Sequence, residues 1–266
     1  MTLVSPSGIV TFTTDYGTRD HYVAEMKGAM LCRSRQLTFV DVTHDVPAQD
    51  VLAATWQVAQ AAEAFPAGTV HLALVDPGVG SEDRGLAIAC MDQYFVGPDN
   101  GIFSHVLFRS GNALIRSLDG RKLGLEPSCR TFFGRDLYGP AAALLASGAL
   151  SFRDLGPVLR KPVRLPDIEY RRDKATLLGN VIHVDVFGNL VTSIPNRETQ
   201  RSRVTATFVG THRIRDYVEC YSDRPAGTLV AMPGSSGFVE ISAINGSAAV
   251  ALGAGRGTSV RVHLRA

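Results

Sequence analysis

The sequence predicts an α/β protein, with an N-terminal α/β domain built on a largely parallel sheet and a smaller C-terminal all-β domain. Two observations support this fold class. In the first half, short apolar runs typical of strands alternate with longer amphipathic runs typical of helices. In the second half, short alternating runs are separated by Gly, Pro, Asn and Asp. A chain of 266 residues is long enough to bury two cores.

The elements of the first half follow in chain order. Strands are expected at 8–15, 36–45 and 69–76, further apolar runs lie at 85–92 and 93–100, and helices are expected at 20–31, 50–65 and 134–150. The run TVHLALVD at 69–76 is almost entirely apolar, as in a strand buried on both faces of a parallel sheet. Asp20 and Asp50 stand where the N-caps of the first two helices are expected.

The junction between the domains is expected within 155–177, where three prolines and a cluster of charges interrupt the pattern. The N-terminal domain is therefore assigned to 1–165 and the C-terminal domain to 166–266. Beyond the junction, the sequence predicts strands within the following ranges: 179–194, 203–214, 227–234, 237–244 and 259–264. Such a series is typical of a small sandwich or barrel.

Composition and charge argue against several classes of partner. The 27 Lys and Arg residues nearly balance 25 Asp and Glu, and no long basic run occurs, so neither nucleic acid nor a membrane surface is expected as a partner. No apolar stretch reaches the length of a membrane span, and MTLVSPSGIV lacks the pattern of a signal peptide, which favours a cytoplasmic location. The cysteines lie far apart and are expected to be buried thiols; they are Cys32, Cys90, Cys129 and Cys220. No histidine spacing suggests a metal site.

Three apolar runs of the first domain end in an aspartate followed by turn residues: Asp15, Asp76 and Asp99. Ligands of open α/β sheets bind outside the carboxyl ends of the strands, so these carboxylates could converge on one crevice. Aspartate before Gly or Pro is also good turn chemistry, and the pattern alone leaves both interpretations open.

Glycine-rich stretches do not indicate a phosphate site. GVGSEDRG fails the dinucleotide fingerprint because Asp83 stands where its last glycine is required, and GAGRG lacks the Lys-Ser/Thr of a P-loop. In the second half, DVFGNLVTSI and PGSSGFVEISAINGSAA set compact polar residues beside apolar runs. These residues suit a loop lining a nucleoside-sized pocket or simply a turn, and spacing does not decide between the two.

A set of ordered motifs nevertheless resembles one family over nearly the whole chain. TFTTDYGTRDHYVAEMKGAM, DVTHDVP, VDPGVG, GPDNG, TFFGRD, DVFGNLVTSI and GSSGFVEISAINGSAA are similar to the motifs of S-adenosylmethionine (SAM) hydroxide adenosyltransferases, relatives of the SAM-dependent fluorinase and chlorinase. The resemblance implies an N-terminal α/β domain, a C-terminal β domain, and a homotrimer that binds SAM at subunit interfaces.

The implied reaction is attack of water or hydroxide on the ribose C5′ of SAM, giving adenosine and L-methionine with no cofactor. The resemblance assigns Asp15 to the ribose hydroxyls and Tyr221 to stacking on adenine. It assigns contacts with the methionine end and the adenine to the remaining binding residues, Asp185, Phe187, Asn189 and Ser236.

The catalytic residues of hydrolysing members are an aspartate, an arginine and a histidine. Asp76 matches the aspartate, at a position where the halogenases have tyrosine, so it favours water over halide as the nucleophile. The arginine is expected seven residues later, where Asp83 stands, which makes Arg84 the candidate one step on. Phe133 occupies the histidine position in TFFGRD, and a phenyl ring cannot relay a proton.

Three hypotheses follow. The leading one is a SAM hydrolase in which Asp76 positions water with support from Arg84. The second is a halogenase-like enzyme, suggested by the aromatic residue at 133. The third is a non-catalytic protein that binds SAM or adenosine, suggested by the missing histidine. His44 is expected to have a structural role.

Overall fold

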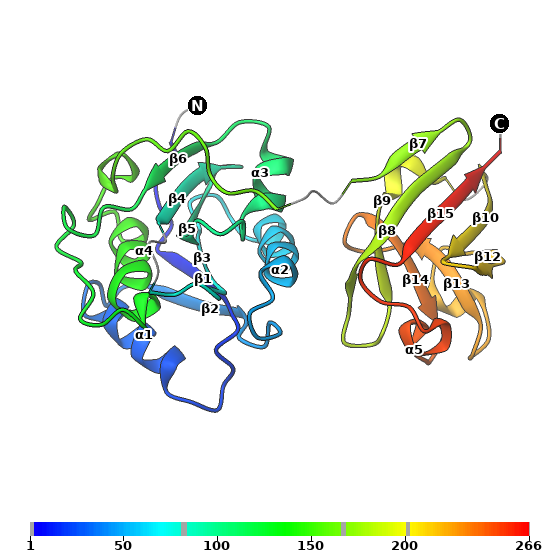
Figure 1. The fold of residues 1–266 in the computed structure, drawn as a ribbon, viewed down its shortest axis with the longest axis horizontal. Helices are drawn as coiled ribbons and strands as arrows, with labels where there is room; N and C mark the ends of the chain where they lie inside the picture. The colour runs from blue at the N-terminus through cyan, green and yellow to red at the C-terminus, as the bar shows by residue number, and fades with distance from the viewer. Residues whose placement is uncertain (1–2, 81–83, 166–168, 201–202, 266) are drawn as a thin grey trace. The chain divides into compact units, whose positions relative to one another are not determined.

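The computed structural model describes residues 3–80, 84–165, 169–200 and 203–265 (Figure 1). The chain divides into two compact units, 1–167 and 168–266. Each unit has its own sheet and core, and each is described by itself.

Within the described residues, the first unit has a six-stranded sheet of order β2-β1-β3-β5-β4-β6. Its strands are β1 (Ile9–Thr14), β2 (Thr38–Thr43), β3 (Val70–Leu74), β4 (Gly85–Cys90), β5 (Gln93–Pro98) and β6 (Leu114–Ser117). The pairings β1–β2, β1–β3 and β3–β5 are parallel, whereas β4 pairs antiparallel with β5 and β6. The sheet is therefore mixed.

The antiparallel part of the sheet has a local cause. Only Met91 and Asp92 connect β4 with β5, and a parallel crossover needs a much longer connection. Both residues have positive φ, 53° and 55°, as in the tight hairpin turn whose twist matches that of the strands.

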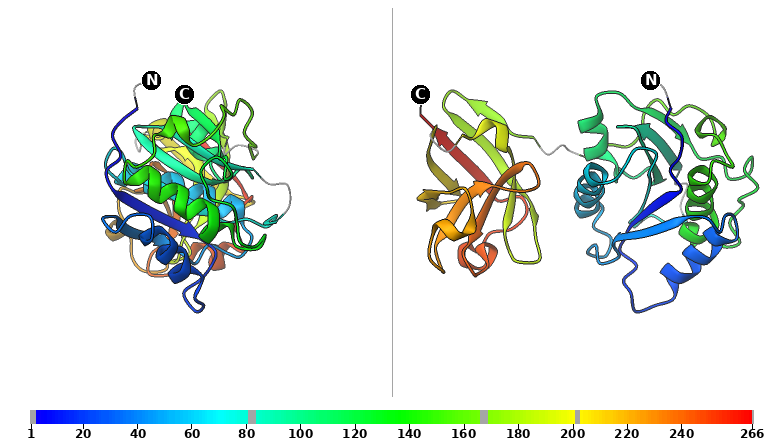
Figure 2. Two further views of the ribbon diagram at one scale, coloured as in Figure 1. Left: turned by 90° about the vertical axis from the view of Figure 1, so that its left-hand side faces the viewer. Right: turned by 180° about the vertical axis from the view of Figure 1, so that it is seen from behind.

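Helices cover both faces of this sheet, as Figures 1 and 2 show. They are α1 (Tyr22–Leu31), α2 (Val51–Ala64), α3 (Ser104–Ser110), the π-helical turn η1 (Gly134–Tyr138), α4 (Gly139–Ala146) and the 3-10 turn η2 (Phe152–Asp154). α1 and α4 share one core cluster with the sheet, and α2 and α3 share another. Alternate residues of β3 join the two clusters: Leu72 and Leu74 face α1 and α4, whereas Ala73 faces α2 and α3. β3 is thus buried on both faces, as its apolar run predicts.

The first unit confirms one sequence-based expectation about helix caps and differs from the expectations in two other details. Asp50 caps α2 by accepting a hydrogen bond of 2.9 Å from Ala53 N, as predicted. Asp20 does not cap α1, which begins after His21 without any side-chain cap. The short elements α3 and β6 were not identified from sequence, because seven and four residues hold too little of a period.

A buried polar chain crosses β1, β3 and β5. His71 Nδ1 lies 2.7 Å from Thr11 Oγ1, and its Nε2 lies 3.2 Å from Gln93 Oε1. Gln93 in turn donates to the carbonyls of Ala62 and Phe65 at the end of α2. Burial lowers the pKa of His71 to about 4, against the opposing effect of its hydrogen bond to Gln93 Oε1, so the ring is neutral in the folded protein.

We predict that this histidine makes the fold sensitive to acid. The unfolded chain, with a histidine pKa near 6.5, binds the proton that the folded chain excludes between pH 6.5 and 4. As the pH is lowered through that range, the free energy of unfolding should therefore fall by up to about 1.4 kcal/mol per pH unit because of His71. Urea titrations at pH 7, 6 and 5 measure this slope. In His71→Gln the slope should be smaller, and equal slopes would contradict the assignment.

The second unit has a nine-stranded sheet within the described residues, of order β11-β10-β15-β8-β9-β14-β13-β12, with β7 paired to β8. The strands are β7 (Arg171–Asp173), β8 (Thr176–Val184), β9 (Leu190–Pro195), β10 (Val204–Val209), β11 (His212–Ile214), β12 (Asp216–Tyr217), β13 (Leu229–Pro233), β14 (Phe238–Ala243) and β15 (Ser259–Leu264). It also contains the 3-10 turns η3 (Asn196–Glu198) and η5 (Tyr221–Asp223) and the helix α5 (Ala248–Leu252), capped by Ser247. The unit is therefore mostly β with one short helix.

The cysteines correct one expectation. All four are free thiols, but only Cys90 is buried; Cys32 and Cys220 are exposed and Cys129 is partly exposed. None of the described helices is long and apolar enough to cross a bilayer.

Candidate functional site

A cavity of about 460 Å³ opens at the carboxyl ends of β1 and β3. Three stretches of the chain line it: the loop after β1 with the start of α1, the loop after β3, and residues 129–138 around η1. These stretches contain parts of three of the sequence motifs, TFTTDYGTRDHYVAEMKGAM, VDPGVG and TFFGRD.

Parallel pairing of β1 with β3 brings two carboxylates to this cavity. Thr14 pairs with Leu74, Asp15 follows Thr14 directly, and Asp76 comes two residues after Leu74. Both aspartates line the cavity. Asp15 Oδ2 accepts a hydrogen bond of 2.8 Å from the backbone N–H of Gln49, and this contact orients the carboxylate.

Asp76 also shapes its own loop. Its Oδ1 accepts a hydrogen bond of 3.3 Å from Gly78 N, and its carbonyl accepts one of 3.3 Å from Val79 N. The turn interpretation and the site interpretation of this aspartate therefore hold together: one oxygen stabilises the turn while the side chain faces the cavity.

Asp99 and Arg84 pair with each other. Arg84 Nη2 donates to Asp99 Oδ2 over 2.8 Å, and Asp99 Oδ1 accepts from Val163 N over 2.8 Å. The Asp99 side chain is almost fully buried, whereas half of the Arg84 side chain is exposed. Neither residue lines the cavity with Asp76. Asp83, the residue at the expected arginine position, lies outside the described residues.

Phe133 lies in the wall of the cavity, directly before η1. Its ring contacts Tyr138 edge-on with centroids 6.4 Å apart, and it also lines a neighbouring cavity of about 670 Å³. The π-helical turn that follows is closed by a hydrogen bond from Gly139 N to Gly134 O. Such turns are frequent at functional sites. The ring separates apolar core from cavity but offers no proton donor or acceptor.

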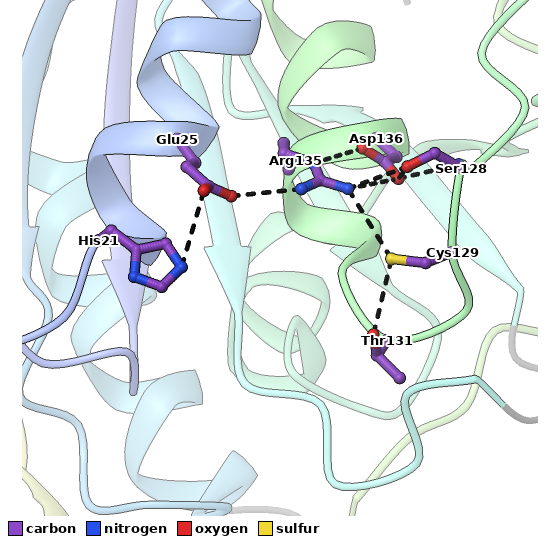
Figure 3. Close-up of polar contacts among 7 residues, drawn as sticks. All are labelled: His21, Glu25, Ser128, Cys129, Thr131, Arg135 and Asp136. Atoms are coloured by element: carbon purple, nitrogen blue, oxygen red, sulfur yellow. Dashed lines mark hydrogen bonds and ion pairs between the residues drawn. The ribbon is translucent and has the colours of Figure 1, made fainter.

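A charged cluster holds the rim beside Phe133 (Figure 3). Arg135 Nε lies 2.6 Å from Asp136 Oδ1, and Arg135 Nη1 lies 3.2 Å from Glu25 Oε2 on α1. Asp136 Oδ2 accepts from both the N–H and the hydroxyl of Ser128, at 2.9 and 2.7 Å. The hydrogen bond from Arg135 lowers the pKa of Asp136 to about 2. The same hydrogen bond raises the pKa of Arg135. Arg135 is thus a bracing residue between α1, η1 and the 126–131 segment.

Cys129 and His21 complete this rim (Figure 3). The Cys129 Sγ lies 3.5 Å from Thr131 Oγ1 and 3.7 Å from Arg135 Nη2, and the hydrogen bond from Thr131 lowers the pKa of the thiol. His21 Nε2 lies 3.6 Å from Glu25 Oε1, and two thirds of its side chain is exposed. His44, by contrast, is buried against Thr14 and Asp41 and does not line the cavity.

We predict that Asp136→Asn loosens this rim in a pH-dependent way. A carboxylate whose folded pKa lies near 2 contributes stability above pH 4 that is lost as the pH falls towards 2. At pH 7 the variant should lose about 1–2 kcal/mol of unfolding free energy in urea titrations, and the difference should close near pH 2. Asp92→Asn, in the exposed β4–β5 turn, is the matched control. A constant difference at all pH values would exclude the ion pair as the cause.

In the second unit, Asp185 organises the loop between β8 and β9. Its Oδ1 accepts from the backbone N–H groups of Phe187 and Asn189, at 2.9 and 2.8 Å, and its Oδ2 accepts from Asn189 Nδ2 at 2.9 Å. Gly188 has φ +82°, and a Cβ there would meet Ser247. The loop consequently presents two apolar side chains to solvent, Val186 with 91% and Phe187 with 73% of its surface exposed.

Tyr221 and Ser236 lie on other loops of the second unit. The Tyr221 hydroxyl donates to Glu240 Oε1 over 2.5 Å, and Ser242 donates to the same oxygen over 2.8 Å. Burial and the bond to Glu240 raise the pKa of Tyr221 to about 12. Ser236 Oγ is buried and has no hydrogen-bond partner within the part of the chain that the structure describes. Glu240 was missed in the sequence, although a glutamate inside the apolar run FVEISAI is a signal for it.

The structure thus gathers the predicted site residues in two sets. Asp15 and Asp76 line one cavity of the first unit together with Phe133, and Arg84 lies apart from them on Asp99. Asp185 and Asn189 share one hydrogen-bonded loop of the second unit.

The comparison with known proteins decides the family. Residues 10–156 match the model of the SAM hydroxide adenosyltransferase N-terminal domain, and residues 179–261 match that of the C-terminal domain. The chain belongs to the SAM hydroxide adenosyltransferase family. Both sets of candidate residues lie within the matched ranges.

The hydrolase relatives match nearly the whole chain. An (R)-S-adenosyl-L-methionine hydrolase of Salinispora tropica is 35% identical over 97% of this chain and 99% of its own length. One from Thermus thermophilus is 34% identical over 95% and 98%. A fluorinase of Actinoplanes is 25% identical over 74% of each chain. A crystal structure of an uncharacterized conserved protein from Thermotoga maritima is similar with a TM-score of 0.89 and 31% identity, over 96% of this chain and 99% of that one.

Proposed function

We propose that this protein cleaves S-adenosyl-L-methionine by attack of water on the ribose C5′, giving adenosine and L-methionine. One observation carries the proposal: Asp76 faces a cavity at the carboxyl end of β3, beside Asp15, in a chain whose relatives are named as SAM hydrolases.

The protein does not need to activate the leaving group. The water oxygen forms a bond to C5′ as the C5′–S bond breaks, and the sulfonium takes the electron pair and departs as the neutral thioether of methionine. One proton of the water must be lost. We assign Asp76 as the acceptor of this proton. Its carboxylate can align the water and take up the proton as the new C–O bond forms.

The remaining residues bind the substrate in this proposal. Asp15, held by Gln49 N, suits the two ribose hydroxyls, because a carboxylate accepts two hydrogen bonds side by side. The second unit supplies the contacts with adenine and the methionine end, from Asp185, Phe187, Asn189, Tyr221 and Ser236. The exposed Phe187 is suited to meeting a ligand, as is Ser236 Oγ, which has no hydrogen-bond partner among the described residues.

The assembly and setting are part of the same proposal. We propose a homotrimer with the sites at subunit interfaces, as the sequence motifs imply, and a reaction that needs no cofactor because SAM is itself the activated substrate. A cytoplasmic location stays a prediction from sequence.

Arg84 is proposed to support the nascent hydroxide, and this role requires it to leave Asp99. Half of its side chain is exposed, so the exchange costs a single ion pair. Its carboxylate partner would then remain buried with Val163 N as its other contact, so the exchange carries the cost of leaving a buried charge without its counter-ion.

The first test is product analysis with the purified protein. The sulfonium is a stereocentre, and the relatives are named for the (R) form, so both sulfur epimers are supplied separately, each with and without chloride. Adenosine and methionine in equal amounts support hydrolysis. A 5′-chlorinated nucleoside formed only with chloride would support the halogenase-like alternative, which the fluorinase relatives and the aromatic Phe133 favour. Binding without products over hours would support a sensor.

We predict that Asp76→Asn lowers the rate constant of adenosine release at least about 100-fold, because an amide cannot accept the proton of the attacking water. Chromatography of adenosine under saturating SAM measures it. Asp92→Asn, a carboxylate on an exposed turn, should match the wild type. Equal adenosine release from the Asp76 variant and the wild type would remove this role.

We predict that Phe133→His raises adenosine release about tenfold, because an imidazole at this wall of the cavity can accept a proton that phenyl cannot. Phe133→Leu serves as the control for a change of packing against Tyr138. An unchanged or lower rate in the histidine variant would mean that the missing imidazole does not limit the reaction.

A further inference from the structure

The Tyr16 hydroxyl is a polar group of the cavity that the family motifs do not assign. Tyr16 follows Asp15 in the loop after β1 and lines the cavity with Asp76 and Phe133. Its ring is fixed by two aromatic neighbours: Phe132 edge-on at 5.9 Å between centroids, and Tyr22 at 6.3 Å. A ring held on two sides presents its hydroxyl in one direction.

That direction is towards the TFFGRD motif. A Cβ placed on Gly134 would lie 2.5 Å from Tyr16 Oη, so only the absence of a side chain at 134 gives the hydroxyl room. Gly134 is the residue next to Phe133. The hydroxyl of Tyr16 therefore approaches the backbone of the motif immediately beside the position where the hydrolysing relatives carry histidine.

Tyr16 shares the wall of the cavity with both carboxylates, Asp15 and Asp76. Burial, then the charge of Asp15, then that of Asp76 raise the pKa of Tyr16, so the phenol keeps its proton. Among the described residues, no group forms a hydrogen bond with Tyr16 Oη. A protonated hydroxyl in the same cavity wall as Asp76 can share a bound water with that carboxylate.

We infer that Tyr16 is a further catalytic residue of the proposed hydrolysis, whose hydroxyl donates a hydrogen bond to the attacking water beside Asp76 and so orients it in place of the absent histidine. The inference rests on the proposed function. The division of labour is chemical: the phenol fixes a lone pair of the water, another lone pair faces C5′, and the proton that leaves goes to Asp76. Tyr16 itself neither gains nor loses a proton.

His21 is the competing candidate for a replacement of the histidine, because its imidazole also lines the cavity. Its ring is directed to Glu25 at the rim, and most of it is in contact with solvent (Figure 3). Tyr16, held between two rings and close to Asp76, is better placed to order a water.

The test compares single-hydroxyl deletions. Tyr16→Phe should lower kcat for adenosine release about 10–100-fold while KM for SAM stays within about twofold, because the lost contact is to the water and not to SAM. Tyr170→Phe removes a hydroxyl from a tyrosine that does not line this cavity and should leave kcat within about twofold. His21→Gln tests the competing candidate. Adding Phe133→His to Tyr16→Phe should recover at least about tenfold of the loss.

A second variant tests the geometry without touching the tyrosine. Gly134→Ala introduces the Cβ that would displace Tyr16 Oη, so it should lower kcat as well. In the Tyr16→Phe background the same change should cost little, because the clashing atom is gone. Additive losses in the double variant would exclude the hydroxyl as the common cause.

The outcomes separate this inference from the function on which it rests. A wild-type protein that releases no adenosine from either epimer of SAM overturns the proposed function and this role with it. A wild type that turns over, with Tyr16→Phe within twofold of its kcat, overturns the role of Tyr16 alone. So does a Tyr16→Phe variant that changes only KM, or a loss that appears in His21→Gln instead.

Discussion

The parallel pairing of β1 with β3 is the constraint on which the site depends. Its register sets Thr14 against Leu74, and the chain then releases Asp15 and Asp76 at the same edge of the sheet. β3 lies between two helical layers and contributes alternate side chains to both cores. A shift of register would exchange the core faces of a strand that has no solvent face, so the relative position of the two carboxylates is protected by the whole core.

The second determinant is the unusual turn at Gly134. The π-helical geometry of η1 and the glycine at its first position let the backbone approach Tyr16 and Leu74 closely. Gly139 serves the same purpose one turn on, where a Cβ would meet Met26 and Met30 of α1. Phe133 thus lies on a wall whose backbone path is fixed by packing against α1, β3 and the loop after β1, and its phenyl ring offers the cavity no proton donor or acceptor.

Much of the fold could be predicted from local sequence, because the apolar pattern of a central strand fits only a position that is buried on both faces of a sheet. The run at 69–76 is apolar throughout and is buried on both faces. Asp50 precedes a helix and caps it, whereas Asp20 looks equally suitable and does not, because the helix begins two residues later. Cys32 and Cys220 illustrate another limit: an apolar residue type gives no signal of exposure when its neighbours are mixed.

The motifs identified the candidate site residues, but the tertiary fold determines which groups each of these residues contacts. Asp15, Asp76 and Asp99 look alike in sequence, yet Asp99 is buried on Arg84 and Val163 N while the other two face the cavity. Tyr16 could not be identified from sequence, because the space for its hydroxyl depends on Gly134, which lies far along the chain. No pattern within one segment contains that information.

The wall of the cavity at 126–131 is attached by polar contacts and not by a core. Ser128 is held by Asp136, and Arg130 donates to the carbonyl of Gly80 in the loop after Asp76. These contacts lie at the surface, where dissolved ions screen electrostatic interactions, with a screening length of about 10 Å at 0.1 M salt. The rigidity of the cavity opening should therefore respond to ionic strength, whereas the position of the carboxylates beneath it, which the sheet fixes, should not.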